Sequence, residues 1–497
     1  MKPMPRAAVV VARDRAGRTV VGTRRPELNF LGGYVVFPGG RVEADDEALA
    51  AALGLDPGEP LSALRAAGLR ELLEEVRLFP VGDRLVHVPD ALAGAGVLEV
   101  AHALAHRPDL ARLAPIARWV TPHFSDVRFD ATYLLLEVDA IEAPIADPRE
   151  LTSARLVAPG DELAAWRAFS TVVAPPTMHT LEALAAMGGD PAGPALVDAV
   201  RRRLDAAPGA GGVDVTYSEV VPGIRQIPLE TPTLPPARHT NTYVVGGRAA
   251  LVVDPATYDD GERARLLEEL ARARAFGAEP AAILLTHHHG DHVGSAAWLR
   301  DTLGLPILAH VETAALLEGV VTVDRLVADG DVLDLGDPSR PFPVEVWHTP
   351  GHAWGHVVLL DRRPGARAMI VGDMVASIGT IIVDPSEGNM AEYLRQLRRL
   401  AAVPGTILFP AHGFPILDGP AKFEQYIAHR LLREARVREA LAVTGGGTVE
   451  ALLPHAYADT PVALYGLAAR SCLAHLEKLV EDGLARRMGE RFERLAG

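Results

Sequence analysis

The chain has 497 residues, of which 48% are hydrophobic and 23% are charged, so we expect about three globular domains and exclude a fibrous or disordered protein. Its 49 basic and 64 acidic residues give a formal net charge of −15, which over the whole molecule opposes long-range attraction to a polyanion. Cys472 is the one cysteine, so a reducing cytoplasm is the expected location, an intramolecular disulfide is excluded, and metal ligands must be His, Asp or Glu.

The first 205 residues are expected to form one domain that opens with a β-strand, because a short apolar run precedes Arg13. No stretch of the chain approaches the ~18 apolar residues of a membrane span. Within this domain the segment RELLEE places Glu71, Glu74 and Glu75 on one face of a helix. Clustered carboxylates repel one another unless a cation joins them, and such oxygen ligands suit Mg²⁺ or Mn²⁺ bridging a diphosphate. A solvated acidic helix is the alternative interpretation.

These residues resemble the box of the Nudix hydrolases, although Asp46 stands where its first Glu is expected, extra residues precede Arg70, and Arg77 replaces its late Gly. Three further segments look like the coenzyme A diphosphatase type of that family: FLGGYVVFPGG at 30–40, RWVTPHFSDVRFDATYLL at 118–135 and VAPPT at 173–177. The resemblance implies a Nudix-like α/β/α domain that hydrolyses a nucleoside diphosphate with Mg²⁺ or Mn²⁺. A nucleotide-sensing module that no longer hydrolyses is the alternative.

A stretch rich in Ala, Gly and Pro at 206–216 is expected to be a linker. After it, short β-branched runs alternate with helix-like segments, a pattern typical of sheets covered by helices. This second domain is expected to span 217–440. Residues 441–497 are expected to form a small, mainly helical third module.

The second domain contains a dense group of ligand-type residues, Thr-His-His-His-Gly-Asp-His, directly after the apolar strand 281–285. In an extended segment His287 and His289 point the same way because side chains repeat with period two. The turn permitted by Gly290 brings Asp291 and His292 beside them. We therefore expect two histidines to face one ion, and an Asp and a His to face a neighbouring ion.

Three later strands are each followed by a turn that carries another ligand-type residue: His352, Asp373 and His412. Imidazole and carboxylate ligands suit zinc, with manganese or iron as alternatives. The competing interpretation, a set of structural histidines, fits other positions better. These are His239, His288, His310, His348, His356, His429 and His475, of which His356 could still reach the rim of the site.

The motifs HHHGDH, HTPGH, VGD and PAHG resemble, in order, those of the metallo-β-lactamase superfamily. The resemblance implies an αβ/βα sandwich with a two-metal site at its rim. It implies that His287, His289 and His352 hold one metal, that Asp291, His292 and His412 hold the second, that Asp373 bridges them, and that Asp254 supports the ligands from behind. The metals would lower the pKa of a bound water towards ~7 and stabilise an oxyanion. Asp291 would be catalytic, accepting a proton after attack.

Antibiotic hydrolysis is disfavoured because Asp373 stands where the commonest β-lactamases have Cys. A closer resemblance is to the β-lactamase-like protein 2 group, whose C-terminal module is winged-helix-like. It rests on HTNTYVVGG at 239–247, GDMVASIGT at 372–380, the run from PAHG to REAL at 410–441 and LAHLEKLVEDGLARR at 473–487. Animal members are endoribonucleases that prefer single strands, whereas glyoxalase II relatives hydrolyse thioesters at an equivalent site.

Two runs of arginine could form a nucleic-acid face, or could be solvated helices with internal ion pairs. They are Arg430, Arg433, Arg436 and Arg438, then Arg486, Arg487, Arg491 and Arg494. The sequence thus predicts a metal-dependent hydrolase of an ester, thioester or phosphodiester bond in a small-molecule or nucleotide-linked substrate. RNA is the alternative substrate, and a nucleotide-sensing protein is the alternative from another functional class. The oligomeric state is not predicted.

Overall fold

The computed structural model describes residues 4–56, 58–122, 125, 127–188, 192–205, 207 and 218–495. The chain divides into two compact units, residues 1–222 and 223–497. The expected linker at 206–216 lies outside the described residues, apart from Ala207. Within the described residues, no helix combines the length and apolarity needed to cross a membrane.

The first unit is built on a mixed sheet whose strands are ordered β10-β2-β1-β8-β7. These strands are β1 (Arg6–Arg13), β2 (Thr19–Arg24), β7 (Ala114–Val120), β8 (Asp130–Glu137) and β10 (Leu151–Val157). Two short strands, β3 (Val35–Val36) and β4 (Gly39–Arg41), pair with β2 and β1. A small separate sheet contains β5 (Leu78–Val81), β6 (Arg84–His87) and β9 (Ala140–Ile141).

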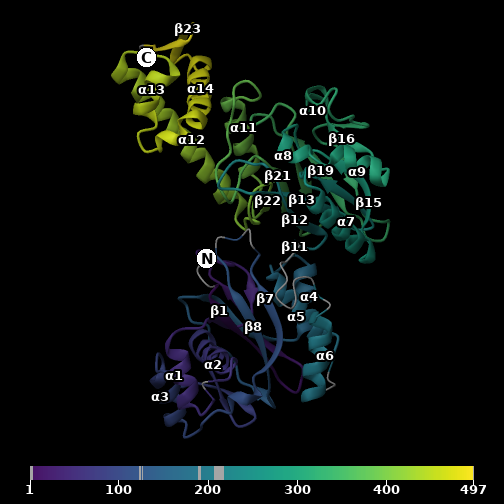
Figure 1. The fold of residues 1–497 in the computed structure, drawn as a ribbon, viewed down its shortest axis with the longest axis vertical. Helices are drawn as coiled ribbons and strands as arrows, with labels where there is room; N and C mark the ends of the chain where they lie inside the picture. The colour runs from purple at the N-terminus through teal and green to yellow at the C-terminus, as the bar shows by residue number, and fades with distance from the viewer. Residues whose placement is uncertain are drawn as a thin grey trace. The chain divides into compact units, whose positions relative to one another are not determined.

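Helices cover both faces of the main sheet, which explains why β1 is continuously apolar from Ala7 to Ala12 rather than alternating. Val10 packs into a core with Leu69 and Leu72 of α2, whereas Val11 packs into a core with Leu181 and Val200 on the opposite face. The helices are α1 (Asp45–Ala52), α2 (Ser62–Val76), α3 (Val97–Ala103), α4 (Pro159–Arg167), α5 (Pro175–Ala185) and α6 (Pro194–Asp205). The main sheet of the first unit therefore lies between two layers of helices (Figure 1).

Two 3₁₀ turns, η1 (Asp90–Leu92) and η2 (Leu110–Arg112), and the strand β11 (Ser218–Val221) complete the first unit. The second unit begins with a sheet in which β12, β13 and β14 are antiparallel and β14 to β17 are parallel. Its strands are β12 (Ile224–Glu230), β13 (His239–Gly246), β14 (Ala249–Val253), β15 (Glu279–Leu284), β16 (Ile307–His310) and β17 (Arg325–Val327).

A second sheet of this unit, ordered β18-β19-β20-β21-β22, packs against the first. Tyr243 of β13 meets Phe409 of β22 with ring centroids 5.9 Å apart, and its hydroxyl donates to the Pro410 carbonyl at 2.6 Å. The strands are β18 (Val332–Asp334), β19 (Pro343–His348), β20 (Val357–Asp361), β21 (Ala368–Gly372) and β22 (Ile407–Pro410). The two inner faces thus form one core between the sheets.

Helices flank the sheets on their outer sides (Figure 1). One of them, α7 (Asp260–Ala275), packs on β12 and β15, and α11 (Met390–Ala401) shares a core with the strands of the second sheet. Short helices α8 (Gly290–Val293), α9 (Ala296–Leu303) and α10 (Val311–Leu316) follow β15 and β16. The layers are therefore helix, sheet, sheet, helix, as the motifs imply.

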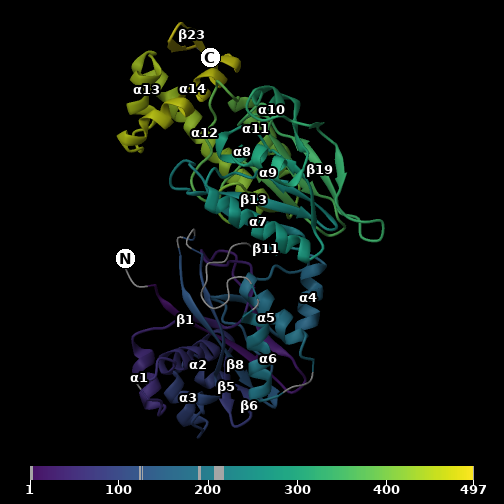
Figure 2. The same ribbon diagram turned by 45° about the vertical axis from the view of Figure 1, so that its right-hand side comes forward.

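The C-terminal module is continuous with the sandwich through one long helix, α12 (Gly419–Thr444). Phe423 and Ile427 of α12 belong to the core of the second sheet, whereas Val437 and Leu441 belong to a core with Cys472. The rest of the module is α13 (Val449–Ala456), η3 (Val462–Leu464), α14 (Tyr465–Glu481) and the hairpin β23 (Ala485–Met488) with β24 (Arg491–Arg494). Figure 2 shows α12 running from the sandwich into this module.

Candidate metal centre

The ligand-type residues follow strands whose C-terminal ends lie at one edge of the sandwich. Strands β14 and β15 are parallel, and β21 and β22 are parallel, so the turns after them emerge together. Asp254 follows β14, the histidine-rich turn follows β15, Asp373 follows β21, and His412 follows β22. His352 lies in the turn after β19. The parallel pairing of these strands therefore brings together residues that are far apart in the chain.

The buried carboxylate of Asp254 organises the histidine-rich turn from behind. It accepts hydrogen bonds from the Thr286 backbone N–H at 2.7 Å, from the Thr286 hydroxyl at 2.6 Å and from His292 Nδ1 at 2.8 Å. Since a threonine hydroxyl has one hydrogen, which Asp254 receives, Thr286 must accept from His287 Nδ1 at 3.0 Å. His287 is thereby fixed with a lone pair on Nε2, and His292 has its lone pair on Nε2 once its second proton is displaced.

Backbone carbonyls fix two more histidines in the same way. His352 Nδ1 donates to the Ile382 carbonyl at 2.7 Å, and His412 Nδ1 donates to the His239 carbonyl at 3.1 Å. A carbonyl can only accept, so each ring, when neutral, has its lone pair on Nε2. Four imidazoles are thus prepared as ligands by their outer hydrogen bonds.

A first cluster is formed by His287, His289 and His352. Its inward nitrogens are separated by 2.9 Å (His287 Nε2 to His289 Nδ1), 3.1 Å (His289 Nδ1 to His352 Nε2) and 3.3 Å (His352 Nε2 to His287 Nε2). Ligands at ~2.0–2.1 Å from a tetrahedral zinc lie about 3.3 Å apart. Three lone pairs cannot satisfy one another, so this triangle fits a cation at its centre.

A second cluster is formed by Asp291, His292 and His412, whose ligand atoms lie within 4.8 Å of one another. Asp373 lies between the clusters: its Oδ1 is 3.4 Å from His412 Nε2 and 3.6 Å from His292 Nε2, and its Oδ2 is 3.5 Å from His352 Nε2. Among the described residues, buried His292 Nε2 and Asp373 Oδ1 have no hydrogen-bond partner. Unpartnered buried atoms of this kind fit a second cation that Asp373 shares with the first.

The two clusters differ in their electrostatics. Burial lowers the pKa of His287 far below its usual value and that of His352 to about 4, so both rings are neutral at pH 7, as coordination requires. Burial also opposes protonation of His292, but the Asp254 carboxylate prevails and raises its pKa to about 10. Burial disfavours ionised Asp373, yet the neighbouring His412 and His292 hold its pKa well below the usual range. Protons therefore occupy the second cluster until a cation displaces them.

His356, which the sequence places among the structural histidines, supports Asp373 through a hydrogen bond. Its ring is fully buried, and Nε2 accepts the backbone N–H of Asp373 at 3.1 Å. Its Nδ1 lies 2.8 Å from the hydroxyl of Thr349. The ring holds Asp373 in place rather than ligating. Its only signal in the sequence is a spacing of four residues from His352.

Glu387 also contacts the first cluster and carries no sequence signal, since no strand directly precedes it. Its Oε2 lies 2.7 Å from His289 Nε2 and 3.8 Å from His288 Nε2. The short contact is a hydrogen bond in which Nε2 donates, so the lone pair of His289 is on Nδ1, facing the first cluster. His288 points to the carboxylate rather than to the cluster.

In the first unit, the three glutamates of α2 are divided. Glu71 and Glu75 are buried, whereas Glu74 is half exposed and accepts from Arg70 at 3.1 Å. Burial raises the pKa of Glu71 to about 7 and that of Glu75 well above its usual value. Glu75 Oε2 accepts from the Gly39 backbone N–H at 3.0 Å. Its buried Oε1 has no hydrogen-bond partner among the described residues and lies 3.7 Å from Arg24 Nη1.

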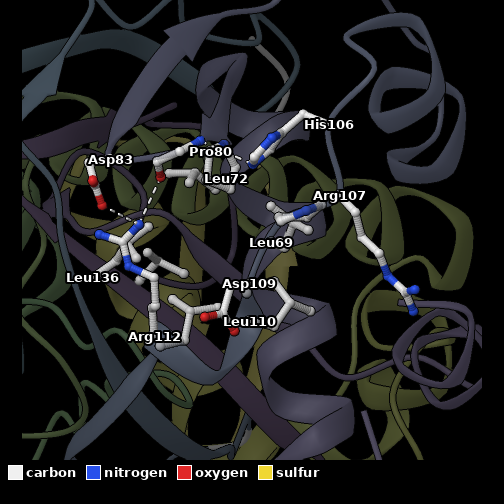
Figure 3. A pocket seen from close by; sticks show the side chains of 15 residues that line it. Leu69, Leu72, Pro80, Asp83, His106, Arg107, Asp109, Leu110, Arg112 and Leu136 are labelled. Carbon is white, nitrogen blue, oxygen red and sulfur yellow. Dashed lines mark hydrogen bonds and ion pairs between the residues drawn. The ribbon is translucent and has the colours of Figure 1, made fainter. Parts of the chain in front are cut away.

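Asp46, which the sequence places at the position of the first box Glu, is buried and pairs with Arg70 at 3.0 and 3.1 Å. A separate cavity of about 280 Å³ lies beside α2 (Figure 3). Leu69 and Leu72 contribute apolar lining, and Arg112, which also lines the cavity, pairs with Asp83 at 3.1 Å. Glu71 and Glu75 do not line this cavity.

Two family models match the second unit. Residues 235–412 match the metallo-beta-lactamase superfamily, and residues 448–494 match the beta-lactamase associated winged helix domain. The winged-helix module predicted for the C-terminal end is therefore confirmed.

Curated relatives are similar over about half of the chain. The lactamase-like protein vrtG of Penicillium aethiopicum is 31% identical over 230 residues, which are 45% of this chain and 68% of that protein. The beta-lactamase-like protein 2 homolog of Drosophila melanogaster is 27% identical over 255 residues, 50% of this chain and 84% of that protein. The atrochrysone carboxyl ACP thioesterase of Passalora fulva is 29% identical over 205 residues, 41% of this chain and 57% of that protein.

Two solved structures are similar to parts of the chain. A metallo-beta-lactamase family protein from Thermus thermophilus is 26% identical, with a TM-score of 0.45, and the match covers 56% of this chain and all of that one (100%). A NUDIX hydrolase from Alicyclobacillus acidocaldarius is 28% identical, with a TM-score of 0.32, and the match covers 37% of this chain and 93% of that one.

Proposed function

Because this chain belongs to the metallo-β-lactamase superfamily and is a metallo-hydrolase, we propose that its second unit uses two divalent cations to hydrolyse an ester or thioester bond of a small acyl substrate. The observation that carries the proposal is the set of inward-facing imidazole lone pairs, each prepared by an outer hydrogen bond. The proposed ligands are His287, His289 and His352 for one cation, Asp291, His292 and His412 for the other, and Asp373 between them.

The chain's own residues have distinct tasks in this reaction. Cations bound there would acidify a water molecule and polarise the acyl oxygen. Asp254 keeps the proton of His292 on Nδ1, directed away from the second cluster. Asp291 is 20% exposed, against 0% for His292 and 8% for His412, so it is the member of that cluster within reach of a substrate. We propose that Asp291 accepts the proton of the water molecule and then passes it to the leaving group.

A small acyl substrate is favoured over RNA by the pairing of the arginine runs. Arg430 is buried, Arg433 and Arg436 both pair with Asp459, at 2.7 and 2.5 Å, and Arg486 pairs with Glu493 at 2.8 Å. Guanidinium groups engaged in this way are less available to phosphates. A relative named as an acyl-carrier-protein thioesterase gives the thioester class a precedent in the superfamily.

The test is a turnover assay with metal-replete protein on acyl-coenzyme A, lactoyl-glutathione and a small aryl ester, beside single-stranded RNA. We expect acyl turnover that falls by ~10²–10⁴-fold in Asp291→Ala, the range of a lost general base. Asp301→Ala, which removes an exposed carboxylate of α9, is the matched control. RNA cleavage without acyl turnover, or RNA binding that weakens steeply with salt, would favour the nuclease instead.

The first unit supports a second candidate activity, a Nudix-like hydrolysis of nucleoside diphosphates with Mg²⁺ or Mn²⁺. Its support is the buried carboxylate pair Glu71 and Glu75, in which Glu75 Oε1 has no hydrogen-bond partner among the described residues. Arg70 lies 2.8 Å from Glu71 and Arg24 lies 3.7 Å from Glu75, and a divalent cation bound between the two carboxylates would further favour their ionised forms. Turnover of coenzyme A or ADP-ribose that disappears in Glu75→Gln, but persists in the exposed control Glu47→Gln, would establish it. Binding of these compounds without turnover would indicate a nucleotide sensor.

A further inference from the structure

The segment 381–389 lies beside the first cluster and contacts two of its histidines. The Ile382 carbonyl accepts from His352 Nδ1 at 2.7 Å, and Glu387 Oε2 accepts from His289 Nε2 at 2.7 Å. We call residues 381–389 the bracing segment. One stretch of chain therefore sets the orientation of two proposed ligands.

The bracing segment is packed tightly against the turn that carries His352. A Cβ at Gly388 would lie 2.2 Å from the Gly351 carbonyl oxygen and 2.6 Å from that of His352, so only glycine fits there. The Asn389 N–H donates to the Gly351 carbonyl at 2.8 Å, and the Trp354 N–H donates to the Glu387 carbonyl at 3.1 Å. The backbone position of Glu387 is thus coupled to the turn of the first cluster.

The C-terminal module and the helix leading into it also contact the bracing segment. Asn389 Nδ2 donates to Glu481 Oε1 of α14 at 2.7 Å, and Arg470 of the same helix lies 3.5 Å from Asp384 Oδ2. Buried Arg430 of α12 donates to the Ile381 carbonyl. Each contact joins the bracing segment to a helix that extends into the module or lies within it.

His289 is the ligand that most needs such support. Its side chain is 25% exposed, whereas those of His352 and His287 are 6% and 0% exposed. Packing therefore restrains its ring least. A carboxylate hydrogen-bonded to the outer nitrogen of a ligating imidazole fixes the tautomer, orients the ring and makes the inner nitrogen a stronger donor.

We infer that Glu387 is a positioning residue for the cation of the first cluster, and that the C-terminal module, through Glu481 and Asn389, holds Glu387 in place. The inference rests on the proposed two-cation site. It makes the module a structural part of the metal centre, so that a displacement of α14 changes the geometry of His289.

The experiment compares zinc binding by full-length wild type, Glu387→Ala, Glu387→Gln and Glu481→Ala, using competition with a chromophoric chelator. Asp482→Ala is the matched control, because Asp482 is the next residue after Glu481 and pairs with Lys478 instead of the bracing segment. Urea unfolding of each metal-free protein separates a positioning role from a structural one.

We expect Glu387→Ala to lower the affinity for one of the two zinc ions by ~10–100-fold, the usual effect of losing such an outer carboxylate. Glu387→Gln should recover part of the loss, because its amide oxygen can accept the same hydrogen bond. Glu481→Ala should lower the affinity for the same ion by about threefold to tenfold, which corresponds to the loss of one modest hydrogen bond. Asp482→Ala should bind both ions as wild type does, and metal-free stability should change little in every variant.

Wild-type affinity for both ions in Glu387→Ala would overturn the inference while leaving the two-cation proposal intact, whereas a wild type that binds no metal would remove both. The C-terminal module would have no role in holding Glu387 if Asp482→Ala lowered the zinc affinity as much as Glu481→Ala does. Wild-type zinc affinity in Glu481→Ala would contradict that role as well. Loss of a third, separate metal ion in Glu387→Ala would instead make His288, His289 and Glu387 a site of their own.

Discussion

The substitution Asp254→Asn tests how the second cluster is prepared from behind. Asp254 adopts a left-handed backbone conformation with φ of 50°, which Asn tolerates well, so the backbone should not change. The remaining oxygen can still accept the Thr286 N–H. The new amide group, however, would face two donors, the Thr286 hydroxyl and His292 Nδ1.

Both donors must then reorganise. The Thr286 hydroxyl turns its hydrogen away, and His292 moves its proton from Nδ1 to Nε2 in order to accept from the amide. The lone pair that faced the second cluster is lost. To bind a cation through Nε2, His292 must return its proton to Nδ1, so both hydrogen bonds to the Asp254 carboxylate are missing in the cation-bound variant. Each buried hydrogen bond to a charged group contributes ~1.5–3 kcal/mol, so their absence costs about 3 kcal/mol or more. At ~1.4 kcal/mol per tenfold, this corresponds to about 100-fold in affinity.

The assay is a zinc titration against a chelator for wild type, Asp254→Asn and the control Asp260→Asn. The carboxylate of Asp260 is exposed and pairs with Arg263 at the start of α7. We expect the variant to bind one ion nearly as wild type does and the second about 100-fold more weakly. Equal affinity for both ions in wild type and Asp254→Asn would refute the account of how the imidazole tautomers are fixed.

Three further outcomes follow from buried groups. His356→Ala removes the acceptor of the Asp373 N–H, so unfolding by urea should show a loss of ~1–3 kcal/mol, and zinc affinity should fall as well; unchanged affinity would contradict the role of His356. Folding raises the pKa of His292 to about 10, so in the metal-free protein the stabilisation from its protonated ring should be lost as pH rises from about 6.5 towards 10. The urea unfolding midpoints at these two pH values should differ less in His292→Gln than in wild type. Burial raises the pKa of Cys472 to about 12 against 9.0, so alkylation at pH 8 should be about a thousandfold slower than in urea, and rapid alkylation of the native protein would argue against the closed module.

The fold could be predicted where the local pattern of apolar and polar residues indicates which positions are buried. Strand β1 is apolar at successive positions because both faces of its sheet are covered. The sandwich and the winged-helix module were predictable from motifs that lie in short continuous stretches. The boundaries at 205, 216 and 440 remain predictions.

The proposed ligands could be found because each follows a strand or a turn that fixes its direction. Thr286, His356 and Glu387 could not, because their contacts depend on how separate strands and loops pack together. Glu387 in particular reaches His289 across 98 residues of sequence. The same holds for the glutamates of α2: their spacing placed three on one face, but packing buries Glu71 and Glu75 and leaves Glu74 half exposed.

The most direct test of the two-cation centre is an anomalous diffraction experiment on crystals of the zinc-loaded protein. We predict two peaks, one among His287, His289 and His352 and one among Asp291, His292 and His412, with Asp373 contacting both. No anomalous peak at this edge of the sandwich, or a single metal bound elsewhere in the chain, would contradict the account.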